Sequence, residues 1–174
     1  MIAITLPDGS VKQYNKGTTP MDVAKSISEG LARNVISASF NNETVESSTP
    51  LATDGSLVLY TWSNDEGKKA FWHSSAHILA QALEQLYPGI KLTIGPAIEK
   101  GFYYDVDFGD ISFSEKDLKA VEVKMLEIAR GKHEFSLRES SKADALNYYK
   151  TQGNQYKVEL IEGLDDGTIT FCDH

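Results

Sequence analysis

Two histidines spaced four residues apart are the side chains in this sequence best suited to chemistry. His73 and His77 lie within HSSAHILAQALEQL, whose apolar residues recur with helical period. Side chains at positions i and i+4 share one helix face, about 5 to 6 Å apart at Cβ, so the two imidazoles converge on one point. Such a pair suits a metal ion, a phosphate or an ester.

The side of the helix that carries these histidines decides between chemistry and packing. At about 100° per residue, the apolar positions centre on one side, namely Phe71, Ile78, Leu79, Ala82, Leu83 and Leu86. His73, His77 and Glu84 fall on the opposite side. If the apolar side is buried, we expect the histidines to face water or a cleft, and histidines held by packing are the alternative.

Metal chemistry requires more ligands than this pair supplies. A zincin metalloprotease has a glutamate directly after its first histidine, whereas Ser74 stands there. A zinc site takes three or four ligands, and His133, Cys172 and His174 are the other soft donors, with a spacing between the last two that suits zinc poorly. We predict no metal site, and a metal-dependent hydrolase using the pair stays an alternative.

Composition indicates a folded protein without general affinity for polyanions. The 174 residues are 41% hydrophobic, and 17 basic against 25 acidic residues give a net charge of −8. The sequence contains one cysteine, no apolar run of membrane-spanning length and no signal-peptide pattern at its start. We therefore expect no membrane association, no internal disulfide and a cytoplasmic location.

The first 62 residues predict a small sheet with one helix. Alternating apolar residues and turn residues predict strands over 2–6, 11–14, 35–40 and 57–61. Thr19 is a predicted N-cap before Pro20, and Gly30 is predicted to end the helix. This β-β-α-β-β order is typical of a β-grasp (ubiquitin-like) domain.

The polar segment 63–67 predicts a linker into a larger α+β domain over 63–174. Its first helix carries the histidine pair and is expected to end near 87–89. Further patterns predict strands over 91–94 and 102–108, a helix from Ser114 to about 130, a helix over 142–150, and extended or mixed segments over 156–161 and 168–171. The predicted fold class is α+β, with a β-grasp domain first.

Five stretches resemble the amino-terminal half of bacterial threonyl-tRNA synthetases: ITLPDGS, TPMDVAKSI, HSSAHILAQAL, IGPAIEKGFYYDVD and GNQYKVELI. The resemblance implies a TGS domain over 1–62 and an editing domain over 63–174. It also implies a homodimeric parent enzyme whose aminoacylation domain, outside this chain, uses ATP, Mg and zinc. No cofactor is expected in this chain itself.

The resemblance further implies hydrolysis of the ester that joins serine to the acceptor end of tRNA(Thr). A synthetic site for threonine discriminates poorly against serine, because one methyl is worth only about 1 to 3 kcal/mol. By residue-wise correspondence, His73 takes an acid/base or water-positioning role and His77 holds that arrangement. Lys157 would stabilise an oxyanion and Tyr104 would line the pocket. The alternative for Lys157 is a strand lysine that reaches solvent, and the alternative for Tyr104 is an aromatic residue of the core.

One departure from the family pattern concerns the end of the editing domain. The family completes its editing site with a Cys-x-Gly-Pro-His-like stretch that this sequence lacks, and Cys172 and His174 match it neither in spacing nor in context. We therefore expect a truncated editing domain. A tRNA-binding or regulatory module without catalysis stays open beside the editing esterase.

Overall fold

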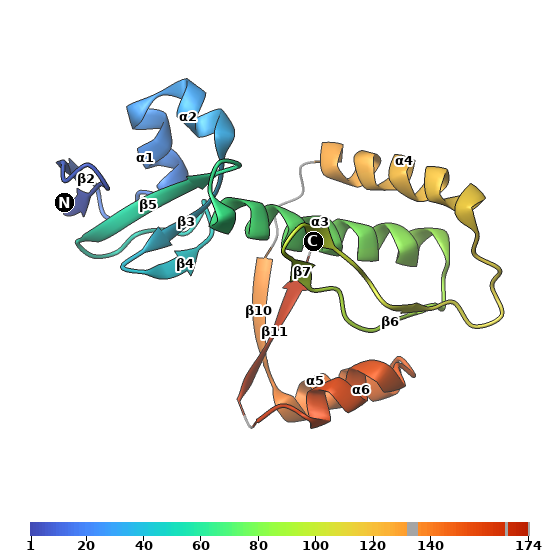
Figure 1. Ribbon diagram of the computed structural model, residues 1–174. Coiled ribbons are helices and arrows are strands. Elements are labelled where there is room, and N and C mark those ends of the chain that lie inside the picture. The colour runs from blue at the N-terminus through green and yellow to red at the C-terminus, as the bar shows by residue number, and fades with distance from the viewer. Residues whose placement is uncertain (132–135, 166, 174) are drawn as a thin grey trace. The chain divides into compact units, whose positions relative to one another are not determined.

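The computed structural model describes residues 1–131, 136–165 and 167–173 (Figure 1). The chain divides into two compact units, Met1–Trp72 and His73–His174, with the boundary inside a long helix.

The first unit is built on a five-stranded mixed sheet. Its strands lie in the order β2-β1-β5-β3-β4, with β1 and β5 parallel and the other pairs antiparallel. Their bounds are Ile2–Thr5 (β1), Val11–Tyr14 (β2), Val35–Phe40 (β3), Glu43–Val45 (β4) and Gly55–Thr61 (β5). The predicted hairpin and strands are confirmed, and β4 is an addition that follows the turn at Asn41 and Asn42, both at positive φ.

Two short helices, α1 (Pro20–Ile27) and α2 (Glu29–Asn34), connect β2 to β3. Thr19 caps α1 as predicted, in a reciprocal capping box with Asp22. The prediction that Gly30 ends this helix is wrong, because the break comes at Ser28. Ser28 has an extended backbone, and its hydroxyl accepts from the Leu31 amide at 3.0 Å, so it ends α1 and caps α2.

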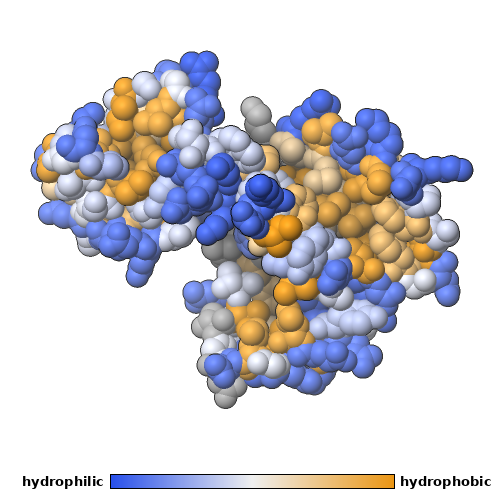
Figure 2. Space-filling model, in the orientation of Figure 1, coloured by the Kyte–Doolittle hydropathy of each residue, from blue (hydrophilic) through white to orange (hydrophobic). Residues whose placement is uncertain are grey.

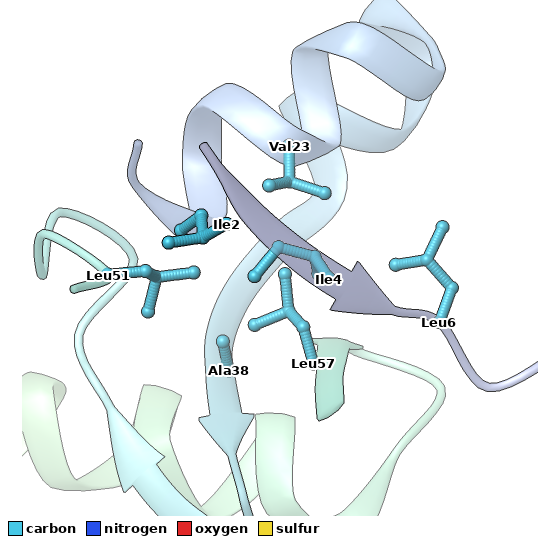
Figure 3. Packing of buried hydrophobic residues seen from close by; sticks show 7 residues of the cluster. All are labelled: Ile2, Ile4, Leu6, Val23, Ala38, Leu51 and Leu57. Carbon is cyan, nitrogen blue, oxygen red and sulfur yellow. The ribbon is translucent and has the colours of Figure 1, made fainter. Parts of the chain in front are cut away.

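The core of this unit lies between the sheet and α1. Alternate residues of β1 point to the same face of the sheet, where they meet Val23 of α1 and residues of β3 and β5 (Figure 3). The buried cluster consists of Ile2, Ile4, Leu6, Val23, Ala38, Leu51 and Leu57. This packing of one helix on a mixed sheet agrees with the predicted β-grasp domain.

The predicted linker is largely helical, because α3 (Asp65–Leu86) already begins inside it. Asn64 accepts from the Thr61 amide at 2.9 Å through its side chain, and this bond turns the chain from β5 into the helix. Gly67 lies against the Thr61 carbonyl, where a Cβ would come within 2.1 Å of the oxygen. No helix in the described ranges is both long and apolar enough to cross a membrane.

In the second unit, α3 is followed by four two-residue strands. They are β6 (Lys91–Leu92), β7 (Ala97–Ile98), β8 (Gly101–Phe102) and β9 (Val106–Asp107). β6 pairs with β9 and β7 pairs with β8, both antiparallel. The strands predicted over 91–94 and 102–108 are therefore shorter than expected, although backbone bonds between Asp105 and both Thr93 and Ile94 keep the two segments together.

Helix α4 (Glu115–Gly131) packs on this unit through few residues. Ser114 begins it as predicted, since its amide and hydroxyl each donate to Asp117 Oδ2 at 2.8 Å. Val121 is buried against Leu83 and Leu92, whereas Leu118 is 54% exposed although it is apolar. Figure 2 shows one face of the molecule, on which hydrophobic residues gather in groups between hydrophilic ones.

The last part of the unit joins a hairpin to two helices. β10 (Ser136–Ser141) pairs with β11 (Thr168–Asp173), and α5 (Lys142–Thr151) and α6 (Gln155–Glu162) lie between them in the chain. The extended segment predicted over 156–161 is wrong, because Asn154 caps a helix there. No strand was predicted at β10, because its sequence SLRESS is polar.

Removing the hydroxyl of Thr19 should destabilise the first unit. Thr19→Ala deletes the capping bond to the Asp22 amide, so we expect the free energy of unfolding to fall by about 1 kcal/mol. Urea denaturation measures this change. Thr18→Ala is the matched control, because Thr18 is fixed through backbone bonds. Equal losses in the two variants would contradict the capping role.

Acid should weaken the same capping box. Hydrogen bonds from the Thr19 side chain and backbone hold the pKa of Asp22 below its ordinary value of 3.8. A carboxylate with a lowered folded pKa adds stability above its unfolded pKa, and this stability is lost as pH falls through the folded pKa. The stability difference between wild type and Asp22→Asn should therefore shrink below pH 3.8. Urea melts across that range measure it, and a constant difference would contradict the expectation.

Candidate active site

The two histidines contact each other on one side of α3. Nε2 of His77 lies 3.1 Å from Nε2 of His73, and the rings meet nearly at right angles with centroids 4.7 Å apart. One nitrogen must donate and the other accept, so this bond exists only when at least one ring is neutral. The bond holds the two rings in a fixed arrangement, and an imidazole at the border of solvent can serve acid/base chemistry.

The sequence pattern predicted that the histidine pair lies opposite the buried face of α3. The structure places the pair at the edge of that face. The buried residues of α3 in the second unit are Ala76, Ala80, Ala82 and Leu83. At about 100° per residue, His73 and His77 lie about 75° and about 115° from the centre of this group. His73 is exposed and His77 is half-buried. Small alanines next to the histidines allow close packing on one side while the imidazoles border solvent.

Phe71, assigned to the buried stripe by the pattern, is 47% exposed. Its ring meets that of Trp62 edge to face at 5.1 Å between centroids, within the first unit. The apolar side chain of Phe71 therefore packs on Trp62 and is not part of a buried core.

Tyr104 is held against the core of the second unit. It packs on the buried cluster around Leu83, and its ring lies so close to Gly95 that a Cβ there would come within 2.2 Å of Cδ2. Burial raises the pKa of the Tyr104 hydroxyl, and the negative charge of Glu84 raises it further. The phenol therefore stays protonated at neutral pH and can donate a hydrogen bond.

Lys157 lies in the first turns of α6 and is half-buried, so the alternative of a strand lysine in solvent is wrong. Asn154 fixes this end of the helix twice. Its Oδ1 accepts from the Lys157 amide at 3.1 Å, and its Nδ2 donates to the Leu92 carbonyl at 3.0 Å. Tyr156 adds a bond of 2.9 Å to Asp107 Oδ2, so α6 is attached to both β6 and β9.

Glu84 is the charge that Lys157 and Tyr104 have in common. Burial lowers the pKa of the Lys157 ammonium, and the Glu84 carboxylate opposes this change. Glu84 also acts on Tyr149 of α5, whose pKa rises to about 12, first through burial and then through neighbouring negative charges. The sequence pattern placed Glu84 on the histidine side of α3 without a role.

The structure thus gathers Lys157, Tyr104, Glu84 and Tyr149 from separate elements. Tyr149 had no signal in the sequence, because α5 lacks a regular apolar period; its ring stacks on Phe171 at 5.7 Å. The histidine pair lies on the same side of α3 as Glu84, and seven residues separate His77 from Glu84, which is about 10 Å along the axis. One helix therefore carries both groups in a line.

The histidine pair alone supplies too few ligands for a metal site. In the described part of the chain, no three His, Cys, Asp or Glu side chains gather in a way that could hold a metal ion. His133, His174 and the side chain of Cys172 lie outside the described residues.

Comparison with known proteins identifies the TGS domain and a group of similar ligases. Residues 2–61 match the family model described as the TGS domain. Over all 174 residues the chain is 68% identical to a threonine–tRNA ligase of Flavobacterium psychrophilum and 66% identical to one of Flavobacterium johnsoniae. The chain belongs with the amino-terminal region of these ligases. It also shares 56% identity over 171 residues with the ligase of Cytophaga hutchinsonii, and it spans 26% of the length of each of the three.

These ligase relatives cover the second unit as fully as the first. The matches extend over 98% of this chain or more. The similarity therefore extends over the second unit as well as over the TGS domain.

Replacing Glu84 by glutamine should lower the pKa of Lys157. Removing the carboxylate charge disfavours the ammonium form, so the Lys157 pKa should fall further below its ordinary value of 10.5. Titration of the Lys157 side chain by heteronuclear NMR measures this shift.

Glu66→Gln is the matched control, because Glu66 is exposed in the first turn of the same helix. It should leave the Lys157 pKa in place. An unchanged pKa in Glu84→Gln would contradict the electrostatic contact.

Proposed function

We propose that residues 63–174 are an editing domain that hydrolyses the ester between serine and the acceptor end of tRNA(Thr), with residues 1–62 as the attached TGS domain. The observation that carries the proposal is the 3.1 Å contact between His73 and His77, in a chain that is 68% identical to a threonine–tRNA ligase. Such a ligase needs correction of serine errors, because the missing methyl gives a discrimination of only about 1 to 3 kcal/mol.

The exposed imidazole of His73 is placed to act on a water molecule. In the proposed reaction, a water oxygen attacks the ester carbonyl while an imidazole nitrogen takes its proton. The carbon–oxygen bond to the ribose then breaks, and the ribose oxygen receives a proton. In this reaction Nε2 of His73 donates to Nε2 of His77, so Nδ1 of His73 is the nitrogen that accepts the proton.

Lys157 and Tyr104 supply the remaining roles. Lys157 is half-buried and its backbone is held in the first turn of a capped helix, which favours the use of its ammonium as a positive charge next to the developing oxyanion. The Tyr104 phenol, kept protonated by burial and by Glu84, supplies a hydrogen-bond donor for the substrate. The parent ligase would act in the cytoplasm on tRNA(Thr), as a homodimer with ATP, Mg and zinc in its aminoacylation domain.

Deacylation of serine-charged and threonine-charged tRNA(Thr) tests the proposal. The chain is assayed alone and as a chimera in which it replaces the corresponding 26% of the Flavobacterium psychrophilum ligase. We expect release of serine and not of threonine by the chimera. His73→Ala should slow serine release by about 10² to 10⁴-fold, and Lys157→Met by about 10² to 10³-fold.

The matched control is Lys116→Gln, an exposed lysine of α4, which should keep full activity. Unchanged aminoacylation by each chimera shows that the variants fold. A chimera that releases no serine contradicts the esterase and favours a tRNA-binding module. Activity lost to a chelator in deacylation alone, with a metal bound in stoichiometric amount at the histidines, would favour the metal-dependent hydrolase.

A further inference from the structure

The first unit contains an apolar groove at the point where α1 ends. Ser28 ends α1 directly after Ile27, which lines the groove. The groove has a volume of about 360 Å³, and its apolar lining comes from Leu6, Ile27, Leu31 and Leu59. This volume is within the range of small-molecule sites, which is about 300 to 1,000 Å³.

Leu6 marks this end of the core. Figure 3 shows it at the far end of β1 from Ile2, apart from the side chains that meet around Val23. Ile27, at the rim, is 40% exposed although it is apolar. An apolar ligand in the groove would remove these side chains from water, which is favourable in proportion to the area covered.

Two opposite charges border the apolar floor. Asp8 and Lys12 both line the groove. Lys12 pairs with Ile4 across the β1–β2 ladder, so its side chain leaves the sheet on the face covered by the helices. The turn holds Asp8 in place, because the amide and the hydroxyl of Ser10 donate to its Oδ1 at 2.9 and 2.6 Å.

These hydrogen bonds also keep Asp8 ionised. They lower its pKa below the ordinary 3.8, and the positive charge of Lys12 adds to the effect. The groove therefore presents a carboxylate and an ammonium beside an apolar floor at neutral pH.

We propose that this groove binds a free α-amino acid with a branched apolar side chain of about the size of leucine. Lys12 pairs with the ligand carboxylate, Asp8 with the ligand ammonium, and the side chain lies on Leu6, Leu31 and Leu59. The charge pattern disfavours other ligands, since a polyanion meets the Asp8 carboxylate and the interior of a peptide has no charges for either group. This site lies in the TGS domain and does not depend on the proposed esterase.

Titration of the full chain with L-leucine, followed by backbone amide NMR, tests the site. We expect saturable shifts at Asp8–Lys12 and Leu31, with a dissociation constant of about 1 mM for so small a ligand in an open groove. Leucinamide lacks the carboxylate and 4-methylpentanoate lacks the ammonium, so each should bind about fivefold more weakly. L-threonine should also bind more weakly, because its hydroxyl would lie on the apolar floor.

Three variants separate the site from general effects. Lys12→Gln should weaken leucine binding about fivefold, and Leu31→Arg should abolish it by filling the groove. Lys16→Gln, an exposed lysine outside the groove, is the matched control and should bind as wild type does. The dispersion of the same amide spectra shows that each variant is folded.

The proposal fails if leucine causes no saturable shift at Asp8–Lys12. It also fails if either analogue or threonine binds as tightly as leucine, or if Lys12→Gln and Lys16→Gln behave alike. Serine release by the chimera is measured separately, so neither result affects the other.

Discussion

The regular geometry of α3 is the constraint on which the candidate site depends. A helix of 22 residues fixes the positions of His73, His77 and Glu84 relative to one another through its own backbone bonds, at about 1.5 Å per residue. Tertiary contacts then have only to bring Tyr104 and Lys157 near Glu84 on this helix. Gly95, which lets the Tyr104 ring approach, and Asn154, which attaches α6 to β6, meet that requirement.

Local sequence signals predicted much of the fold. The turn between the first two strands, the N-cap at Thr19 and the helix start at Ser114 each depend on a few neighbouring residues, and the structure confirms all three. Gly30 misled because glycine ends helices only where the backbone must take a positive φ, and Ser28 had already ended α1 with its own side chain.

The candidate site could be predicted only in part, because sequence signals report contacts between residues that are close in the chain. The spacing of His73 and His77 belongs to one helix, so their contact follows from the sequence. The partners of Glu84 do not, because Lys157 and Tyr149 reach it from α6 and α5 through the packing of the whole unit. The orientation of α3 was predicted in part. Ala82 and Leu83 are buried and His73 is exposed, as expected, but Ala76 and Ala80 are buried too, although they carry little apolar weight in a periodicity argument.

The side chain of Asn154 makes two hydrogen bonds with different effects. One caps α6, and the other attaches α6 to β6. Aspartate at this position would still accept from the Lys157 amide, but it would have no hydrogen to donate to the Leu92 carbonyl. A chemical change from amide to acid, such as deamidation during ageing, would thus leave the helix intact while releasing it from β6. The choice of asparagine as the cap therefore provides a tertiary contact as well. Loss of its side-chain nitrogen would remove the hydrogen bond to β6 and keep the hydrogen bond that caps α6.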